Sequence, residues 1–373
     1  MKGAPPNGPA AMMRSILQRI ATGPELSKDI SFEEAWAGMR SILEREVDPV
    51  QAGVFLIALR MKRETDDENR GVMQAIREAT HRVIAPVDEV LDIADPYDGY
   101  IRTLPASPFL PAVLAACGVA TVSHGVEIMG PKYGVTHRQV LRAAGLPVDL
   151  SVEEAAARLG DPECGWAYVD QRAFCPKLHE LAGLRSLIVK RPSITTVEVL
   201  AGPLRGRLST HLVTGYVHKP YPRIYALLAR AAHFDSALLV RGIEGGIVPS
   251  LRQNGKAFFY HERGEEQQVE FHPADWGVVQ SMRAPQIPRL PESGADDETA
   301  PIDIAATAAA AAQAGRDALG GAAGATRDAL VSAGALCLWH LRRRESLAAA
   351  ADAVRQALDN GRALARIQPE LAA

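Results

Sequence analysis

Between residues 88 and about 280, short runs of apolar or β-branched residues alternate with segments of helical periodicity. The short runs include "VATVSHG", "GWAYVD" and "SALLVRG", and the helical segments include "SVEEAAARLG" and "YPRIYALLARAAHF". Such alternation is typical of strands that are joined through helices and therefore lie parallel to one another. The pattern predicts an α/β domain built on a largely parallel sheet.

Residues 12–82 differ, because helical segments follow one another there without intervening strands. Ser31 begins one of these segments with Glu34 at capping-box spacing, and Asp48 with Pro49 begins another. The pattern predicts a small all-α bundle, which we expect helices from about 172–195 to join. Residues 1–11 are rich in proline and glycine and are expected to form a disordered leader.

The C-terminal part begins with a Pro-rich, acidic stretch at residues 284–301 that lacks apolar periodicity and predicts an exposed linker. Ala-rich helical segments follow it. The middle one, "ATRDALVSAGALCLWHLRRR", has too many apolar positions for a solvated tail. We therefore expect these helices to dock on the α/β domain, which then extends over residues 88–373.

Charge and cysteine content argue against several classes of protein. Lys and Arg total 41 against 44 Asp and Glu, a net charge of −3, so no overall basic field attracts nucleic acid or anionic membranes. The four cysteines form no CxxC pair, which argues against structural zinc and a disulfide scaffold. The sequence has no signal-peptide core and no apolar run long enough to span a bilayer, so a cytoplasmic protein without a membrane partner is expected.

Local motifs spread over some three hundred residues carry a family resemblance. They are, in chain order, "VDPVQAGVFLIALRMKRET", "VATVSHGVEIMGPKYG", "LRAAGLPVDLSVEEAAARLG", "AGPLRG", "VEFHPADWGV" and "ALDNGRALARI". Together they resemble the anthranilate phosphoribosyltransferase family, which has the same fold class as the pyrimidine nucleoside phosphorylases. The resemblance implies a helical bundle plus an α/β domain, and a homodimer that pairs through the bundle. It also implies binding of phosphoribosyl pyrophosphate with Mg²⁺ at the carboxyl edge of the sheet.

Residues 94–108, "ADPYDGYIRTLPASP", take the place of the family's Gly-Thr-Gly-Gly-Asp-Gly loop, which cups the pyrophosphate. Asp98 and Gly99 keep that pattern, and Ser107 stands for the Asn-Ile-Ser-Thr that follows. A loop that binds phosphate through its backbone needs several glycines, so we interpret this one as a remodelled ligand loop. Arg102 is either a cation that replaces lost backbone donors or a solvated loop residue.

The second family loop, "SHGVEIMGPKYG", is matched at His124, Gly125, Lys132 and Gly134. Lys132 is the best candidate for a phosphate contact, with a plain surface lysine as the alternative. His124 is either a neutral hydrogen-bonding wall of the site or a satisfied histidine at a strand end. Glu127 replaces part of the family's Asn-Arg pair and would be repelled by pyrophosphate unless magnesium intervened.

The third family element lies in "LLVRGIEGGIVPS", where an Asp-Glu pair helps to hold magnesium in the family. Only Glu244 remains of that pair. One carboxylate with substrate oxygens can bind Mg²⁺, so Glu244 is the candidate metal residue, with a plain turn residue as the alternative. The glycines around it form a turn that either admits an anion or merely reverses the chain.

Basic residues concentrate in two further segments, "LIVKRPSITTVEVL" and "VTGYVHKPYPRIY". Lys190 and Arg191 fall near the family's arginine for the acceptor carboxylate. We expect Lys132, His124 and Glu244 to converge on one cleft. We also expect the Lys190 and Arg191 pair to form, with Lys219, a positive patch at its mouth.

Two function classes fit these observations. The first is a pentosyl or phosphoribosyl transferase with remodelled donor loops, which takes a phosphorylated sugar or another small anionic ligand and an acceptor other than anthranilate. The second is a non-enzymatic relative that binds nucleic acid or a protein partner, since cations interleaved with tyrosines suit single-stranded nucleic acid. The slightly acidic net charge favours the transferase, because nonspecific nucleic-acid binding depends on neutralising phosphates.

Overall fold

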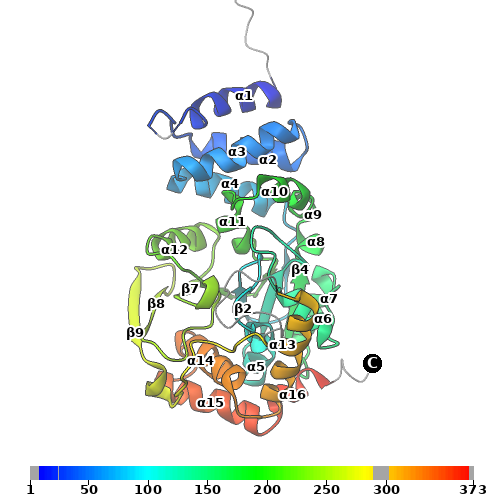
Figure 1. Ribbon diagram of the computed structural model, residues 1–373, viewed down its shortest axis with the longest axis vertical. Coiled ribbons are helices and arrows are strands. Elements are labelled where there is room, and N and C mark those ends of the chain that lie inside the picture. The colour runs from blue at the N-terminus through cyan, green and yellow to red at the C-terminus, as the bar shows by residue number, and fades with distance from the viewer. Residues whose placement is uncertain (1–7, 24, 289–301, 369–373) are drawn as a thin grey trace, which may run out of the picture.

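The computed structural model describes residues 8–23, 25–288 and 302–368, which form a helical bundle at one end and a larger α/β domain below it (Figure 1). The bundle helices are α1 (Pro9–Ile20), α2 (Phe32–Leu43), α3 (Pro49–Lys62) and α4 (Asp66–Glu78). The expected capping box is present, since the Ser31 hydroxyl accepts from the Glu34 amide and the Glu34 side chain accepts from Ser31. The first helix already begins at Pro9, within the stretch expected to be a leader, and residues 1–7 of that stretch lie outside the described residues.

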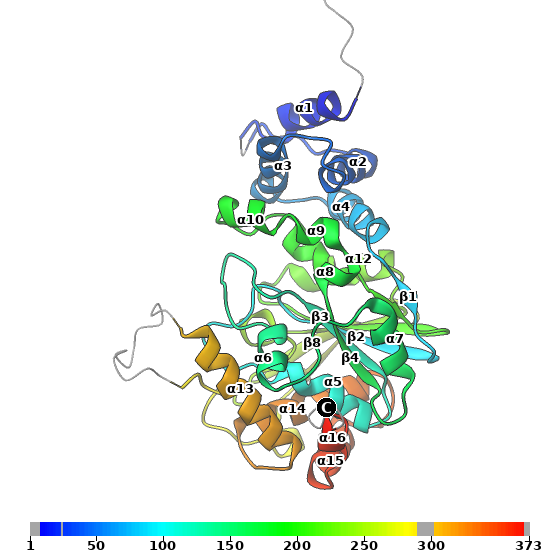
Figure 2. The same ribbon diagram turned by 90° about the vertical axis from the view of Figure 1, so that its right-hand side faces the viewer.

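Four short helices lie between the bundle and the sheet (Figures 1 and 2). They are α8 (Gln171–Phe174), α9 (Pro176–His179), α10 (Ala182–Ile188) and α11 (Ile194–Val197). α10 packs against α3 and α11 against α4, and the Ser193 amide donates to the Leu56 carbonyl at 3.1 Å. This segment therefore connects the two domains.

The α/β domain is built on a seven-stranded sheet in the order β4-β3-β2-β6-β7-β8-β9. The strands are β2 (Glu89–Ala94), β3 (Thr121–Gly125), β4 (Trp166–Asp170), β6 (Ser209–Gly215), β7 (Ser236–Val240), β8 (Gly255–Tyr260) and β9 (Gln267–Phe271). The pairs from β4 to β7 are parallel, and β8 and β9 add antiparallel strands at one edge. A separate two-stranded parallel sheet joins β1 (Val83–Ile84) and β5 (Leu204–Arg205). The prediction of a bundle with a largely parallel α/β domain is confirmed.

Helices cover the sheet, so that its central strands are buried on both faces. The helices of the domain are α5 (Leu110–Ala116), α6 (His137–Ala143), α7 (Val152–Gly160), α12 (Tyr221–Ala231), α13 (Ile304–Leu319), α14 (Ala325–His340), α15 (Leu347–Asp359) and α16 (Arg362–Ala365). Along β2, Leu91 and Ile93 join the core that includes α14 and α15, whereas Val90 and Ala94 join the core shared with the bundle. Among the described residues, no helix is both long and apolar enough to cross a bilayer.

Only part of the expected linker, residues 284–288, is described. Ala284 and Pro285 are buried there, and the Leu104 amide donates to the Pro285 carbonyl at 2.9 Å. The expectation of an exposed linker is therefore wrong for these two residues, because this part of the chain pairs with the loop that follows β2. The remaining residues of the stretch, 289–301, lie outside the described part of the chain.

Candidate anion-binding site at the carboxyl edge of the sheet

The loops that follow β2 and β3 meet at the carboxyl edge of the sheet. The Tyr100 amide donates to the Val135 carbonyl at 3.0 Å, the Val135 amide donates back at 2.8 Å, and the Gly134 amide donates to the Asp98 carbonyl at 2.9 Å. A Cβ atom at Gly134 would lie 2.5 Å from the Tyr100 nitrogen, and Gly99 has a φ of +72° and faces Gly134 equally closely. Gly99 and Gly134, two of the glycines that match the family, therefore let the two backbones touch.

Asp95, directly after β2, is the centre of a buried network under the first loop. Its carboxylate accepts from Tyr100 Oη at 2.6 Å, Ser107 Oγ at 2.5 Å, His137 Nε2 at 2.8 Å and the Ile247 amide at 3.0 Å. Burial would raise the pKa of Asp95, but the hydrogen bonds from these side chains and the charge of His137 lower it below its ordinary value. Ser107 is fully buried in this network, so it supports the loop and does not face a ligand.

Sequence reasoning missed this network. One feature of the sequence could have indicated it: Asp95 stands at the end of a predicted buried strand, in the stretch where the family has a glycine-rich loop. Burial raises the pKa of Tyr100 well above its ordinary value, so the phenol stays protonated and donates to Asp95.

Glu244 occupies the backbone donors of the first loop. Its carboxylate accepts from the Ile101 amide at 3.0 Å, the Arg102 amide at 3.0 Å and the Thr103 hydroxyl at 2.8 Å. Successive amides of this kind are the groups that bind phosphate in other α/β proteins. In this chain an internal carboxylate already satisfies them.

The glycine turn around Glu244 serves close packing. A Cβ atom at Gly246 would lie 1.9 Å from Tyr100 Oη, and one at Gly242 would lie 1.6 Å from the Gly246 carbonyl oxygen. The Gly246 amide donates to the Ile243 carbonyl at 2.9 Å. Of the two interpretations of this turn, the tight reversal of the chain agrees with these contacts.

Asp98 brings two predicted cations together. Its carboxylate lies 3.2 Å from Lys132 Nζ and 2.6 Å from an Arg191 guanidinium nitrogen. Lys132 Nζ also donates to the Glu244 carbonyl oxygen at 3.4 Å. The structure thus collects Asp98, Lys132, Arg191 and Glu244 in one place.

His124 does not share that place. The residue is 1% exposed, its Nε2 lies 2.8 Å from Asp92 Oδ1, and its Nδ1 lies 2.6 Å from Tyr97 Oη. Gly125, the next residue, is also buried, and a Cβ atom there would meet Tyr168 Oη at 3.3 Å. His124 therefore has the satisfied strand-end environment, and the expected convergence with Lys132 and Glu244 does not occur.

A cavity of about 100 Å³ lies between these loops and the helices that face them. Its walls include Asp98, Arg191, Glu244, Arg60 of α3 and Thr195 of α11. Pockets that bind small molecules usually measure about 300–1,000 Å³. The cavity is therefore smaller than a typical small-molecule pocket.

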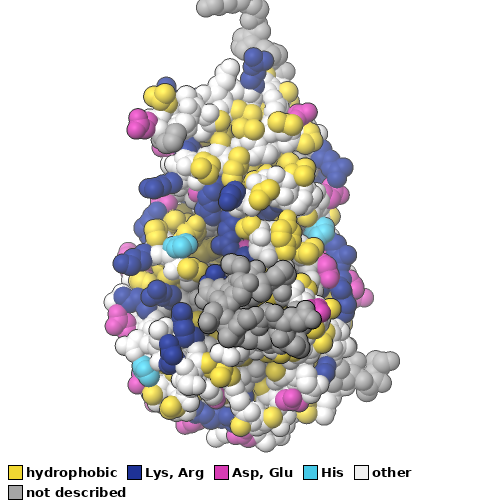
Figure 3. Space-filling model, in the orientation of Figure 1, with side chains coloured by type: hydrophobic (Ala, Val, Ile, Leu, Met, Phe, Trp, Pro, Cys, Tyr) yellow, Lys and Arg dark blue, Asp and Glu magenta, His cyan; other side chains and the backbone are white. Residues whose placement is uncertain are grey.

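Lys190 and Lys219 lie outside this cavity. Both are exposed, and in the described part of the chain neither has an acidic side chain within ion-pair distance. Figure 3 shows Lys and Arg side chains gathered between the bundle and the α/β domain. Arg191, in contrast, is paired with Asp98.

Both domains match one known family. Residues 14–80 match the helical bundle domain of a glycosyl transferase family, and residues 101–364 match its a/b domain. The chain belongs to this glycosyl transferase family.

Relatives agree with this assignment. An uncharacterized protein of Aquifex aeolicus is 32% identical over 227 residues, which cover 60% of this chain and 65% of that protein. The anthranilate phosphoribosyltransferase of Methylocella silvestris is 29% identical over 233 residues, 62% of this chain and 63% of that enzyme. The matches thus span slightly less than two thirds of these relatives. A solved anthranilate phosphoribosyltransferase from Saccharomyces cerevisiae, in complex with PRPP and Mg, shares the fold at 14% identity, with a TM-score of 0.72 over 97% of this chain and 99% of that chain.

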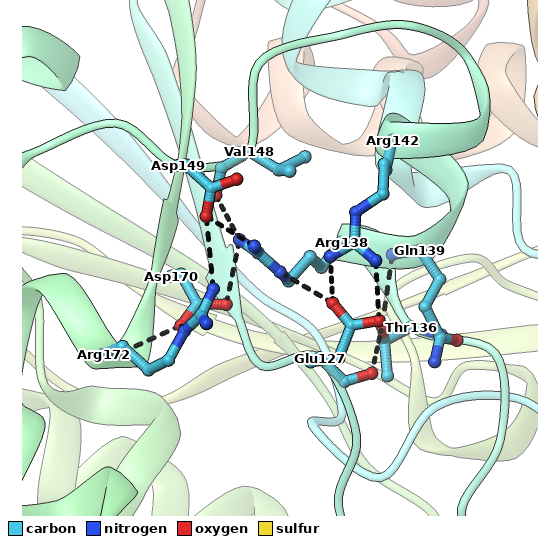
Figure 4. A network of polar contacts seen from close by, with 9 residues as sticks. All are labelled: Glu127, Thr136, Arg138, Gln139, Arg142, Val148, Asp149, Asp170 and Arg172. Carbon is cyan, nitrogen blue, oxygen red and sulfur yellow. Dashed lines mark hydrogen bonds and ion pairs between the residues drawn. The ribbon is translucent and has the colours of Figure 1, made fainter.

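In this member of the glycosyl transferase family, Glu127 turns away from the ligand loops. Its carboxylate pairs with Arg138 at 2.8 Å and with Arg142, and Arg138 also pairs with Asp149 at 2.5 Å and Asp170 at 3.3 Å (Figure 4). Burial would raise the pKa of Glu127, but the two arginines lower it. The expected repulsion between Glu127 and a bound anion therefore has no basis in this arrangement.

A magnesium ion, which the family resemblance implies, does not fit the residues present. Mg²⁺ needs an octahedron of oxygen ligands, of which a protein site usually supplies one or two carboxylates. The Glu244 carboxylate is engaged by three hydrogen bonds, and Asp98 is engaged by two cations.

Proposed function

We propose that this chain is a pentosyl transferase of the glycosyl transferase family with remodelled donor loops and an acceptor other than anthranilate. Its ligand is a phosphorylated sugar, or a related small anion, that carries less charge than a sugar pyrophosphate. The observation that carries the proposal is the Glu244 carboxylate, which holds the amides of residues 101 and 102 and the Thr103 hydroxyl.

Charge balance supports the proposal. Lys132 and Arg191 both pair with the Asp98 carboxylate, and the Glu244 carboxylate adds a second negative charge nearby. Arg60, also in the cavity wall, lies 3.5 Å from a carboxylate oxygen of Glu64, so the site has no surplus positive charge for a pyrophosphate. Pentosyl transfer depends on positioning the donor and neutralising the leaving group. A ligand phosphate that displaced the Glu244 carboxylate would gain the loop amides, while Lys132 and Arg191 would supply its counter-charge.

Replacement of Glu244 by glycine tests the proposal. Glu244 has a φ of +53°, which glycine adopts without strain, so the variant frees the loop donors with little cost to the turn. We expect calorimetric titration with ribose 5-phosphate to show at least about tenfold tighter binding, a gain of about 1.4 kcal/mol. Glu244→Gln, which removes only the charge, should give a smaller gain.

Glu265→Gln is the matched control, because Glu265 is exposed and does not line the cavity. Unchanged or weaker binding by Glu244→Gly would refute the role of Glu244. Tight, Mg²⁺-dependent binding of phosphoribosyl pyrophosphate by the unaltered protein would refute the remodelled donor site. Salt-sensitive binding of a single-stranded oligonucleotide, without any sugar phosphate binding, would instead support the nucleic-acid alternative.

We also propose that two copies pair through the helical domain. Val50 and Met61 of α3 are 74% and 73% exposed, and Leu187 and Val189, on and after the adjoining α10, are 80% and 67% exposed. An apolar face of this kind is typical of an interface.

We expect sedimentation velocity to show that the unaltered protein is a dimer, and that the double variant Met61→Lys with Leu187→Lys is a monomer. Val279→Lys, at an 82% exposed position outside the bundle, should leave the dimer intact, and a monomeric unaltered protein would contradict the proposal.

A further inference from the structure

A second and larger cavity, of about 570 Å³, lies at the opposite edge of the sheet. Glu89, Ser209 and Ser236, the first residues of β2, β6 and β7, line it together with His340, the last residue of α14, and His261, which follows β8. Its volume is within the range of small-molecule pockets. None of these residues takes part in the site at the carboxyl edge.

A chain of hydrogen bonds forms one wall of this cavity. His340 Nε2 lies 2.8 Å from Ser236 Oγ, Ser236 Oγ lies 2.7 Å from His211 Nδ1, and His211 Nε2 lies 3.1 Å from Glu89 Oε1. Burial lowers the pKa of His340 well below its ordinary value, so its imidazole is neutral. One set of donor and acceptor roles satisfies every contact in this chain of hydrogen bonds. In it, His340 donates to Ser236, Ser236 donates to His211, and His211 donates to Glu89.

These roles leave His340 Nδ1 as a buried acceptor, which has no partner among the described residues. His340 is 1% exposed, and its ring stacks on that of His261 with centroids 4.7 Å apart and planes 18° apart. Buried polar atoms without a partner are rare in native proteins and call for an explanation. A ligand in the adjacent cavity is one source of such a partner.

Two opposite charges stand unpaired at the rim. Arg342 and Glu262 both line the cavity, and in the described part of the chain neither side chain has a hydrogen bond or an ion pair. The other charges there are balanced, because Arg263 pairs with Asp235 at 2.9 Å and Glu89 with His211 and Arg343.

Apolar surface completes the cavity. Leu208 lines it and is 79% exposed, and Leu341 and the partly exposed His261 stand on other parts of the wall. The cavity therefore offers a cation, an anion, polar imidazoles and an apolar surface within one volume.

We propose that this cavity binds an α-amino acid with an apolar or aromatic side chain. Arg342 receives the carboxylate, since its guanidinium matches that group in geometry and charge. Glu262 receives the ammonium group, and Leu208 and Leu341 contact the side chain. A ligand with a single charge would leave one of the two rim residues unpaired, which is why a zwitterion fits better than a simple acid or amine.

Titration with L-phenylalanine tests the proposal, with phenylpropionate and phenethylamine as probes that lack its ammonium and its carboxylate, respectively. The imidazole C–H resonances of His261 and His340 report binding at this cavity by NMR. We expect L-phenylalanine to shift these resonances with saturation, and each half-ligand to bind at least about tenfold more weakly. Absence of saturable shifts at millimolar concentrations, or equal binding of a half-ligand, would overturn the proposal.

Variants provide the second measurement. Arg342→Gln and Glu262→Gln should each weaken L-phenylalanine binding at least about tenfold, whereas Arg344→Gln and Glu345→Gln should leave it unchanged. The control residues are exposed in the same part of the chain and do not line the cavity. Equal binding by Arg342→Gln and Arg344→Gln would refute the site. Glu244→Gly should not affect this titration, so its outcome is independent of the function proposed for the carboxyl edge.

Discussion

Replacement of Glu198 by glutamine is expected to lower the free energy of unfolding by about 3–5 kcal/mol, because it leaves the Arg185 guanidinium buried without a counter-charge. The side chains of Arg185 and Glu198 are each 1% exposed, and two nitrogen–oxygen contacts of 2.6 and 2.7 Å join them. Removing one partner of a buried ion pair costs more than the pair contributes, since the remaining charge has lost its solvation.

In the described part of the chain, Glu198 is the only carboxylate that pairs with Arg185. Its Nε is buried without an acceptor among the described residues, and its other side-chain contact is Thr195 Oγ1 at 3.4 Å. Arg185 lies on α10 and Glu198 directly after α11, so the pair fixes the segment that carries Arg191 to the cavity. The same substitution should therefore also weaken binding at the carboxyl edge.

Urea denaturation followed by circular dichroism measures this effect. Asp88→Asn is the control, because the Asp88–Arg207 pair is 62% and 56% exposed and should contribute less than about 1 kcal/mol. The double variant Arg185→Met with Glu198→Met should recover most of the loss, since apolar residues can replace a buried pair. A Glu198→Gln protein as stable as Asp88→Asn, or a double variant no better than the single one, would contradict this account.

The fold was predictable because its signals are local. Strand and helix periodicities, capping residues and motifs in a fixed order each depend on a few neighbouring residues. Asp98, Lys132 and Arg191 were predictable for the same reason, since each matches or lies near a family motif. These residues do meet, through the ion pairs of Asp98.

The rest of the site depends on contacts between distant segments. Glu244 was expected to hold a metal, but its partners lie more than 140 residues earlier in the chain, at residues 101–103. His124 and Ser107 match or stand for family positions, yet both side chains are buried. A motif does not show which distant segments pack over a side chain, so this burial could not be predicted from the sequence. The aspartate network under the first loop has no counterpart in the motif, so only the structure reveals it.

Replacement of Asp95 by asparagine is expected to lower the free energy of unfolding by about 2–3 kcal/mol, because hydrogen bonds to a buried charged group are lost. One carboxylate oxygen of Asp95 accepts from Tyr100, Ser107 and His137, and an amide nitrogen in its place would face three donors. The hydroxyls can rotate, but His137 can accept at Nε2 only in the neutral form that carries its proton on Nδ1. That nitrogen is buried and has no partner within the described ranges.

The pH dependence distinguishes this loss from a simple packing defect. Because the pKa of Asp95 is lower in the folded protein, its contribution is present above the unfolded value of about 3.9 and disappears as the pH falls through the folded value. Denaturation between pH 7 and 2 should therefore show a shallower acid loss for Asp95→Asn than for the unaltered protein. Asp352→Asn, at a 69% exposed position, should follow the unaltered protein. If the free energy of unfolding of Asp95→Asn and of the unaltered protein fell in parallel with pH, the Asp95 charge would not stabilise the loop after β2. That result would contradict the role given to Asp95 in the remodelled site.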